Sequence, residues 1–155
     1  MRVLDLACGE GRHALTVAQW GASVTAVDQN DTKLESGREA AGRLGVEIDW
    51  QRVDLTGTWP PLGSFDAVLV FNYLDRNRMA DIHGFVAPRG LLLMETYLEW
   101  QRALGWGPTR EEHLLAPGEL ARLVNPLEIL HGREVFEPAA DNRIRAVASI
   151  VGMKR

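Results

Sequence analysis

The sequence contains only one cysteine, Cys8, so no disulfide bond can form within the chain. A chain without disulfides is typical of the reducing cytoplasm, where we expect this protein to be found. No apolar stretch approaches the roughly 20 residues that span a bilayer, and no basic segment leads into an apolar one near the start. We therefore expect neither a membrane span nor a secretion signal.

Lysine is also scarce, because only Lys33 and Lys154 are present, and the formal net charge is −4. Nucleic-acid binding without sequence preference needs an extended positive surface, so this charge disfavours it, although a local arginine site for a phosphate or carboxylate stays open. Three of the four histidines, His13, His83 and His113, are scattered without metal-ligand spacing. We expect them to be structural or solvated, and we expect no metal site.

Apolar runs separated by turn residues predict an alternating α/β chain that forms one domain over residues 1–155. Strands are predicted at 2–7, 23–27, 46–53, 65–71, 90–97, 127–136 and 144–153, and helices at 13–20, from a cap at Asn30 or Thr32 to 44, at 76–86 and at 117–124. Such an order favours a seven-stranded, mostly parallel sheet flanked by helices, with an antiparallel C-terminal hairpin. Residues 98–115 are predicted to form a long connection. Its Trp100 and Trp106 either close over a site or pack the connection onto the sheet.

A glycine turn follows the first predicted strand, where Gly9 and Gly11 flank Glu10. Glycine allows a backbone to approach a ligand closely, and the N–H groups at the start of the next helix favour an anionic group. Asp5 lies inside that first strand, where a buried carboxylate needs a hydrogen-bond or cationic partner. An aminoacyl ligand offers an ammonium group to Asp5, whereas a pyrophosphate repels it, so Asp5 favours S-adenosylmethionine over a dinucleotide. Asp5 can also brace the turn through backbone amides.

Two further acids follow predicted strands. Asp28 ends the second strand, where a carboxylate can accept hydrogen bonds from both hydroxyls of a ribose or can cap the next helix. Asp54 follows the third strand, where it can accept from the exocyclic amine of adenine, with Leu55 against the face of the ring, or can simply belong to a turn. Because carboxyl ends of parallel strands share one edge of a sheet, these groups are expected to meet there.

Residues 4–11 (LDLACGEG), 26–28 (AVD) and 53–55 (VDL) resemble the class I S-adenosylmethionine-dependent methyltransferases. The resemblance continues through Phe65–Val68, Pro88–Gly90 and the terminal strands, and it implies a Rossmann-like fold and S-adenosylmethionine as cofactor. It assigns cofactor binding to Asp5, Ala7, Gly9, Gly11, Asp28, Gln29, Asp54, Leu55 and Asn72. Ala7 stands where many members have a glycine. Tyr73, Glu95 and Tyr97 are candidate substrate residues near the strand ends.

A narrower likeness to small bacterial methyltransferases related to tellurite-resistance enzymes runs through residues 73–76, 95–108, 114–120 and 133–134. It indicates a small-molecule methyl acceptor without identifying it. Methyl transfer from a sulfonium is an in-line displacement that needs alignment more than a fixed catalytic group, so no catalytic residue is named. Cys8 is expected to be a small buried filler beneath the turn.

Three functions stay open from the sequence. The favoured one is methyl transfer to a small molecule; the others are a non-catalytic S-adenosylmethionine-binding module and a nicotinamide-dependent oxidoreductase. Class I enzymes usually have helices before the first strand, whereas Met1 lies essentially on that strand here. A truncated chain, an unusual start or a cover supplied by a partner subunit would each account for this difference.

The open pocket and the uncovered faces predict self-association, with a homodimer as the simplest form. Light scattering on concentrated protein checks this expectation, and a mass of two chains is the expected result. A strictly monomeric mass at high concentration would contradict it.

Overall fold

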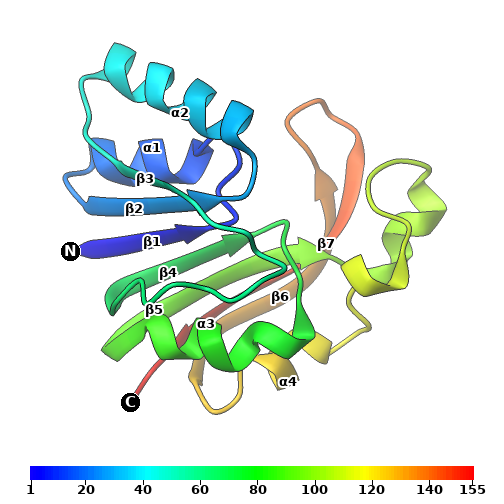
Figure 1. Ribbon diagram of the computed structural model, residues 1–155. Helices are drawn as coiled ribbons and strands as arrows, with labels where there is room; N and C mark the ends of the chain where they lie inside the picture. Colours follow the sequence, from blue (N-terminus) through cyan, green and yellow to red (C-terminus); the bar gives the residue numbers. More distant parts are fainter.

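The computed structural model describes all 155 residues as one seven-stranded sheet with strand order β3-β2-β1-β4-β5-β7-β6 (Figure 1). The strands are β1 (Arg2–Leu6), β2 (Ser23–Asp28), β3 (Asp49–Arg52), β4 (Phe65–Phe71), β5 (Val86–Tyr97), β6 (Glu128–Pro138) and β7 (Ile144–Met153). Strands β1 to β5 pair in parallel, whereas β7 is antiparallel to both β5 and β6. The predicted α/β fold, a Rossmann-like mostly parallel sheet with an antiparallel C-terminal hairpin, is confirmed.

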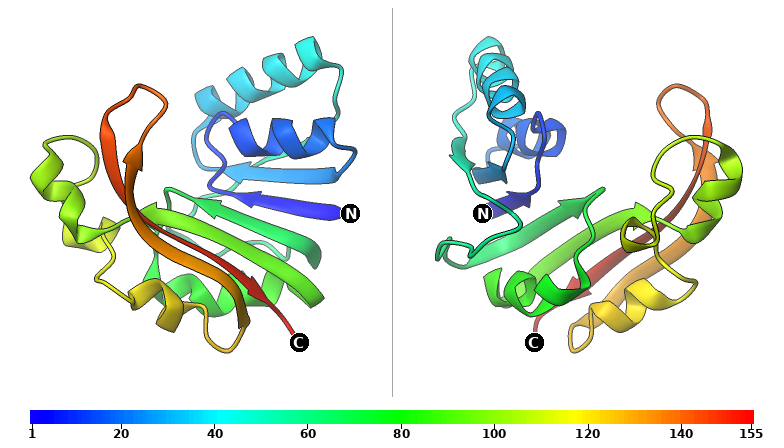
Figure 2. Two further views of the ribbon diagram at one scale, coloured as in Figure 1. Left: turned by 180° about the vertical axis from the view of Figure 1, so that it is seen from behind. Right: turned by 45° about the vertical axis from the view of Figure 1, so that its right-hand side comes forward.

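Helices cover both faces of the sheet. Helices α1 (Arg12–Gln19) and α2 (Asp31–Leu44) lie on one face, and α3 (Met79–Phe85) and α4 (Glu119–Leu123) lie on the other (Figures 1 and 2). The β6–β7 hairpin curls toward the side of α1 and α2, as the view from behind in Figure 2 shows. None of the helices is both long and apolar enough to cross a membrane.

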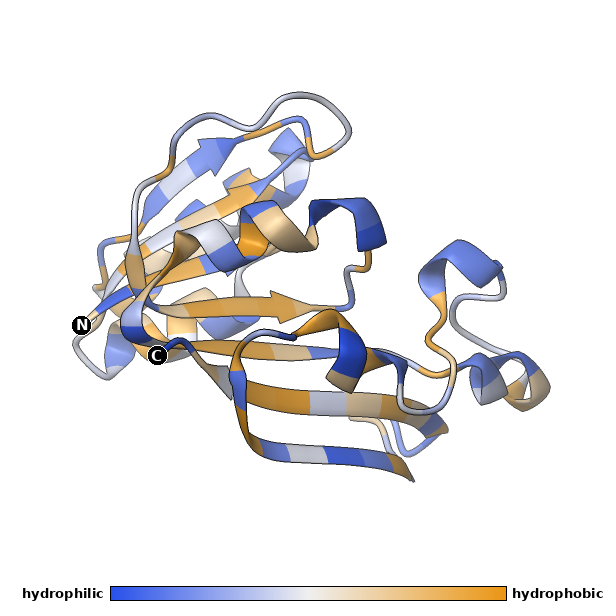
Figure 3. Ribbon diagram, turned by 90° about the horizontal axis from the view of Figure 1, so that it is seen from below, coloured by the Kyte–Doolittle hydropathy of each residue, from blue (hydrophilic) through white to orange (hydrophobic).

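Apolar side chains form a core on each side of the central strands. The larger core packs Met79, Ile82 and Phe85 of α3 against β1, β4 and β5, and the smaller one packs Ala14 and Ala18 of α1 against β1 and β2. Figure 3 shows the strands at the centre of the sheet as mostly hydrophobic and the outer segments as mixed or hydrophilic. Continuous apolar runs in parallel strands are expected when both faces are covered.

Several predicted boundaries are wrong in detail. Strand β3 spans Asp49–Arg52 rather than 46–53, because it is an edge strand that pairs only with the last four residues of β2. Strand β5 begins at Val86 rather than at 90, since residues 88–90 form an irregularity within the strand, with Arg89 at φ 64°. The predicted helix at 76–86 divides into a short 3₁₀ helix, Arg76–Arg78, and α3.

The N-cap of α2 is Asn30 and not Thr32, because the Asn30 side chain accepts a hydrogen bond from the Lys33 backbone N–H at 3.1 Å. A side-chain oxygen at this position satisfies one of the free N–H groups that begin a helix. Helix α4 spans Glu119–Leu123, slightly shorter than the predicted 117–124.

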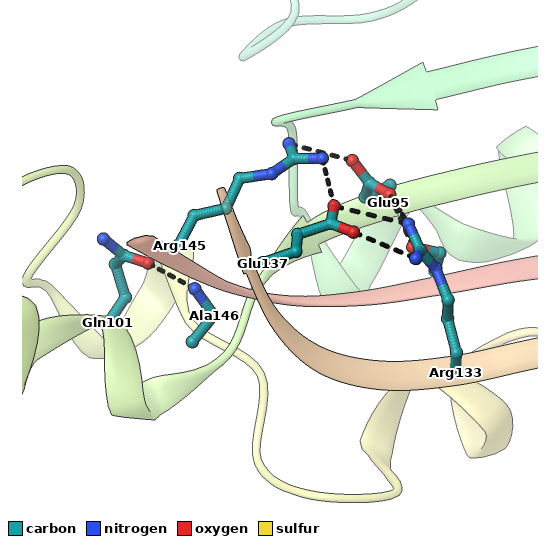
Figure 4. Close-up of polar contacts among 7 residues, drawn as sticks. Glu95, Gln101, Arg133, Glu137, Arg145 and Ala146 are labelled. Atoms are coloured by element: carbon teal, nitrogen blue, oxygen red, sulfur yellow. Dashed lines mark hydrogen bonds and ion pairs between the residues drawn. The ribbon is translucent and has the colours of Figure 1, made fainter. Parts of the chain in front are cut away.

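The connection predicted at 98–115 contains two 3₁₀ helices, Glu99–Leu104 and Glu111–His113, and packs onto the sheet. Gln101 is fully buried, and its Oε1 accepts from Ala146 N at 2.8 Å (Figure 4). Its Nε2 donates to Trp106 O at 2.9 Å. The indole of Trp106 donates to Ile144 O at 2.8 Å, and Trp100 packs against Phe136. Of the two alternatives for these tryptophans, packing is therefore the one that the structure shows.

The indole of Trp50 in β3 lies between Gly11, which precedes α1, and Gly37 in the middle of α2. A Cβ atom at Gly37 would come within 2.4 Å of the ring, and one at Gly11 within 2.3 Å. By contrast, Gly42 faces open space in the same helix. The close approach of α1, α2 and β3 thus depends on two missing side chains.

We expect Gly37→Ala to lower the free energy of unfolding by about 1–3 kcal/mol, because the added methyl group overpacks the contact with Trp50. The matched variant Gly42→Ala should raise it by about 0.5–1 kcal/mol, since alanine favours a helix interior and meets no neighbour. Urea unfolding of both variants and the wild type measures the two effects. Equal stability changes would show that the Trp50 contact does not limit position 37.

Candidate cofactor-binding site

The carboxyl ends of β1, β2 and β4 meet at one edge of the sheet, next to a cavity of about 1070 Å³. In open parallel sheets this edge is the usual place for a ligand. The predicted residues Asp5, Ala7, Gly9, Asp28, Gln29, Leu55, Asn72 and Tyr73 line this cavity. Gly11, Asp54, Glu95 and Tyr97 do not line it.

The glycine turn connects β1 to α1 in an unusual backbone conformation. Ala7, Gly9 and Gly11 have φ values of 57°, 57° and 79°. A left-handed conformation costs about 1–2 kcal/mol for a residue with a Cβ atom, so Ala7 is strained where a glycine would not be. Hydrogen bonds from Cys8 N to Val27 O and from Gly11 N to Cys8 O, both 2.9 Å, hold the turn.

The carboxylate of Asp28 links this turn to the end of β2. Its Oδ2 accepts from Gly9 N at 2.8 Å, and its Oδ1 accepts from Asn30 N at 2.9 Å. Asp28 is nearly buried yet borders the cavity. Each oxygen can accept more than one hydrogen bond, so the carboxylate keeps capacity for a ligand.

Asp5 lies beneath the turn, and only 2% of it is exposed. Its Oδ2 accepts from Ala14 N in α1 at 3.0 Å. Burial raises the pKa of Asp5 to about 7, and the negative charge of Asp28 adds to the rise, while the Ala14 hydrogen bond opposes it. A cation in the cavity would favour the ionised form. Asp5 therefore braces the turn, as one of the two predicted roles requires, and borders the cavity as well.

Asp54 and Leu55 lie in different surroundings. Leu55 lines the main cavity, whereas Asp54 lines a smaller cavity of about 540 Å³ together with Gln29, Asn30 and Arg52. The Asp54 Oδ1 atom accepts from Thr56 N at 2.9 Å and from Thr56 Oγ1 at 2.7 Å, and these bonds lower the pKa of Asp54. Gln29 and Asn30 border both cavities, so the two are adjacent.

Glu95 belongs to a charged cluster on β5, β6 and β7 rather than to the cavity lining (Figure 4). Its carboxylate lies 3.1 Å from Arg145 and 3.7 Å from Arg133, and both arginines also pair with Glu137. Ser149 donates a further hydrogen bond to Glu95. Nearby, Tyr97 packs edge-on against Trp106. The cavity thus includes one of the three candidate substrate residues, Tyr73.

Sequence reasoning missed part of the lining. Glu10, Arg12, His13, Lys33, Thr56, Phe71, Asp75, Glu112 and His113 also border the cavity. The position of His13 directly after the glycine turn was the available signal, because the first turn of that helix faces the strand ends. Glu112 and His113 had no local signal, since they reach the cavity from the long connection.

Cys8 also lines the cavity and is half-buried, so the prediction that it is a filler beneath the turn is wrong in its location. Burial and the charges of Asp5 and Asp28 raise the pKa of the Cys8 thiol far above its usual range. The thiol therefore stays protonated, which makes it a poor nucleophile.

Comparison with known proteins gives the family. Residues 3–90 match the model of the methyltransferase domain family. The chain is 30% identical over 163 residues to a ubiquinone biosynthesis O-methyltransferase of Methylocella silvestris, and the match covers 89% of this chain and 62% of that protein. The first curated relatives are all longer, and the chain spans 55–66% of their length.

Solved structures share the fold over nearly the whole chain. A SAM-dependent methyltransferase of Methanosarcina mazei superposes with a TM-score of 0.78 at 21% identity, covering 99% of this chain and 92% of that one. TehB of Haemophilus influenzae superposes with a TM-score of 0.75 at 18% identity, covering 99% of this chain and 57% of that one. The family match decides against the nicotinamide-dependent alternative, and the chain belongs to the class I S-adenosylmethionine-dependent methyltransferases.

Proposed function

We propose that this chain is an S-adenosylmethionine-dependent methyltransferase that acts on a small-molecule acceptor by in-line methyl transfer. The observation that carries the proposal is the cavity in which Asp5, Asp28 and the glycine turn meet at the strand ends. S-adenosylmethionine supplies a methyl group on a positively charged sulfur that is already a good leaving group. The chain then has to align the reactants and exclude water from them.

The residues around the turn suit the methionine part of the cofactor. We assign Asp5 to its ammonium group and Ala7 and Gly9 to the close backbone approach that its carboxylate needs, while Gly11 shapes the turn from outside the cavity, beside Trp50. The N–H groups at the start of α1 favour that carboxylate, because they have no partner within the helix. The rise in the pKa of buried Asp5 supports this assignment, since a cationic ligand would favour its ionised form.

The other end of the cavity suits the nucleoside. We assign Asp28 and Gln29 to the ribose, Leu55 to the face of the adenine and Asp54 to its exocyclic amine. Asp28, Gln29 and Leu55 border the main cavity, which supports their assignment. Asp54 borders the adjacent smaller cavity, so its contact requires the adenine to reach the boundary between the two.

Asn72 and Tyr73 follow β4 and are assigned to the methyl group and the acceptor. Asn72 has φ 56°, and its N–H donates to Glu95 O at 2.9 Å, so its backbone is held at the cavity rim. The curated relatives are named O-methyltransferases, which supports an oxygen acceptor.

Glu95 and Tyr97 do not line the cavity, and we propose that they support the residues at its rim without touching the acceptor. The homodimer and the cytoplasmic location stay predictions from the sequence.

We expect Asp28→Ala to weaken S-adenosylhomocysteine binding at least about tenfold, because hydrogen bonds to a charged group contribute about 1.5–3 kcal/mol each. Asp31→Ala is the matched control, since Asp31 is an exposed acid near the start of α2 that pairs with Arg52 and does not line the cavity. Calorimetric titration of the three proteins measures the affinities. Equal affinity of Asp28→Ala and wild type would contradict the ribose assignment.

A folded wild type that does not bind S-adenosylhomocysteine would contradict the proposed function as a whole. Binding without transfer of a labelled methyl group to any hydroxyl or thiol compound would instead identify a non-catalytic binding module.

The affinity for S-adenosylhomocysteine should depend on pH through Asp5. Below its pKa of about 7 Asp5 is mostly protonated, so a ligand ammonium must displace a proton. Affinity should therefore fall by up to about tenfold per pH unit as the pH drops from 7 to 5.5, and should change by less than about twofold from pH 7 to 8. Asp5→Asn should remove this dependence, and calorimetry in buffers of different ionisation heat should detect proton release only for the wild type. An affinity of the wild type that is constant from pH 5.5 to 8 would show that Asp5 only braces the turn.

A further inference from the structure

His13 lies between the glycine turn and the end of β4, at the lining of the cavity. It is in the first turn of α1, directly after the glycine turn, and its ring stacks on Phe71 at the end of β4, with 4.0 Å between ring centroids and 25° between ring planes. Phe71 immediately precedes Asn72 and Tyr73, and all four residues line the cavity. The imidazole therefore bridges the turn assigned to the methionine part and the strand end assigned to the acceptor.

The His13 imidazole has a free lone pair near neutral pH. Its ring is half-buried, and no hydrogen bond to the protein contributes to its protonation equilibrium. Burial lowers the pKa of His13, and the neighbouring Arg12 cation on α1 lowers it further. The carboxylate of Glu95 on β5 acts in the opposite direction and is the remaining charged group that affects the ring.

Glu95 gives this arrangement a second component. It is a buried carboxylate whose charge is shared with Arg133 and Arg145, and it favours a positive charge on His13. Burial and Arg12 thus favour the neutral imidazole, whereas the charge of Glu95 favours the imidazolium that forms once a proton arrives. The geometric contacts of Glu95 are with Arg133, Arg145 and Ser149, so Glu95 influences His13 through its charge alone.

We propose that His13 is the general base that removes the proton from a hydroxyl group of the methyl acceptor. The inference rests on the proposed function and adds the chemical class of the acceptor, an alcohol or phenol. As the O–H bond breaks, its proton goes to a His13 nitrogen, and an oxygen lone pair forms the new bond to the methyl carbon. The electrons of the methyl–sulfur bond return to sulfur, which becomes a neutral thioether, and the imidazolium then gives its proton to water.

A matched pair of variants tests this role. His13→Asn removes the base, and His83→Asn is the control, because His83 is also a half-buried histidine with a lowered pKa but lies on α3, outside the cavity lining. Both variants should bind S-adenosylhomocysteine within about threefold of the wild type, a difference of less than 1 kcal/mol. If the wild type itself does not bind S-adenosylhomocysteine, the result contradicts the proposed function rather than the role of His13.

The activity measurement uses two probes, 3,4-dihydroxybenzoate and benzenethiol. General bases contribute about 10²–10⁴-fold, so His13→Asn should lower kcat for the hydroxyl probe at least about 100-fold. It should lower kcat for the thiol, which ionises in water near neutral pH, by less than about tenfold. His83→Asn should change neither. Equal losses for both probes would show that His13 has only a structural role.

The kcat of the wild type for 3,4-dihydroxybenzoate should keep its full value down to a pH below that at which an ordinary imidazole gains its proton, because the pKa of His13 is lowered. Below that pH the kcat of the wild type should fall as His13 gains its proton, and His13→Asn should not show this fall. A fall that persists unchanged in the variant would overturn the proposal.

A third measurement does not depend on turnover. Sinefungin has a protonated amine where S-adenosylmethionine has its methyl group, so a neutral His13 facing that position should accept a hydrogen bond from it. We expect His13→Asn to lower the affinity for sinefungin relative to S-adenosylhomocysteine at least about tenfold, as for one hydrogen bond to a charged group. His83→Asn should leave the ratio unchanged. An unchanged ratio in His13→Asn would overturn the proposal even if neither probe is methylated.

Discussion

The two hydrogen bonds of the Asp28 carboxylate join the turn after β1 to the start of α2. One holds Gly9 in the turn after β1, and the other holds Asn30, whose own side chain caps α2. Through one side chain, the end of β2 therefore fixes the turn, the start of a helix and the border of the main cavity. A nearly buried carboxylate is stable there because backbone N–H groups solvate it in place of water.

Residues that follow parallel strands were predictable, whereas residues on the hairpin side were not. Asp5, Gly9, Asp28 and Leu55 line the cavity because strand ends converge whatever the details of packing. Glu95 also lies near a strand end, yet β7 brings Ser149 and Arg145 beside it, and its carboxylate turns to them. Such pairing depends on the register between distant segments, which local sequence patterns do not contain.

The same reasoning applies to the fold. The order of strands and helices follows from apolar runs and turn residues, and the seven strands form the predicted mostly parallel sheet. The length of β3 depends instead on how much of β2 is left to pair with it. The packed state of the long connection depends on one buried amide, Gln101, whose partners lie on β7 and within the connection itself. A polar residue in a predicted loop gives no sign of such burial.

The charged cluster on β5, β6 and β7 pairs two carboxylates with two guanidinium groups. Glu95 and Glu137 alternate with Arg133 and Arg145, so the four charges largely cancel within the sheet. Partly buried ions cost desolvation energy that only close pairing offsets. Because Glu95 is on β5 and its partners are on β6 and β7, this pairing also resists sliding of the hairpin along the central strands.

The indole of Trp50 joins the edge strand to the cofactor turn. Its ring fills the space beside Gly11 and Gly37, so β3 cannot leave the sheet without uncovering the start of α1. Edge strands are usually the first parts of a sheet to open and to exchange their amide protons with solvent. Here that local opening would also loosen the turn, so any ligand that orders the turn would slow amide exchange along β3, including at residues that it does not touch.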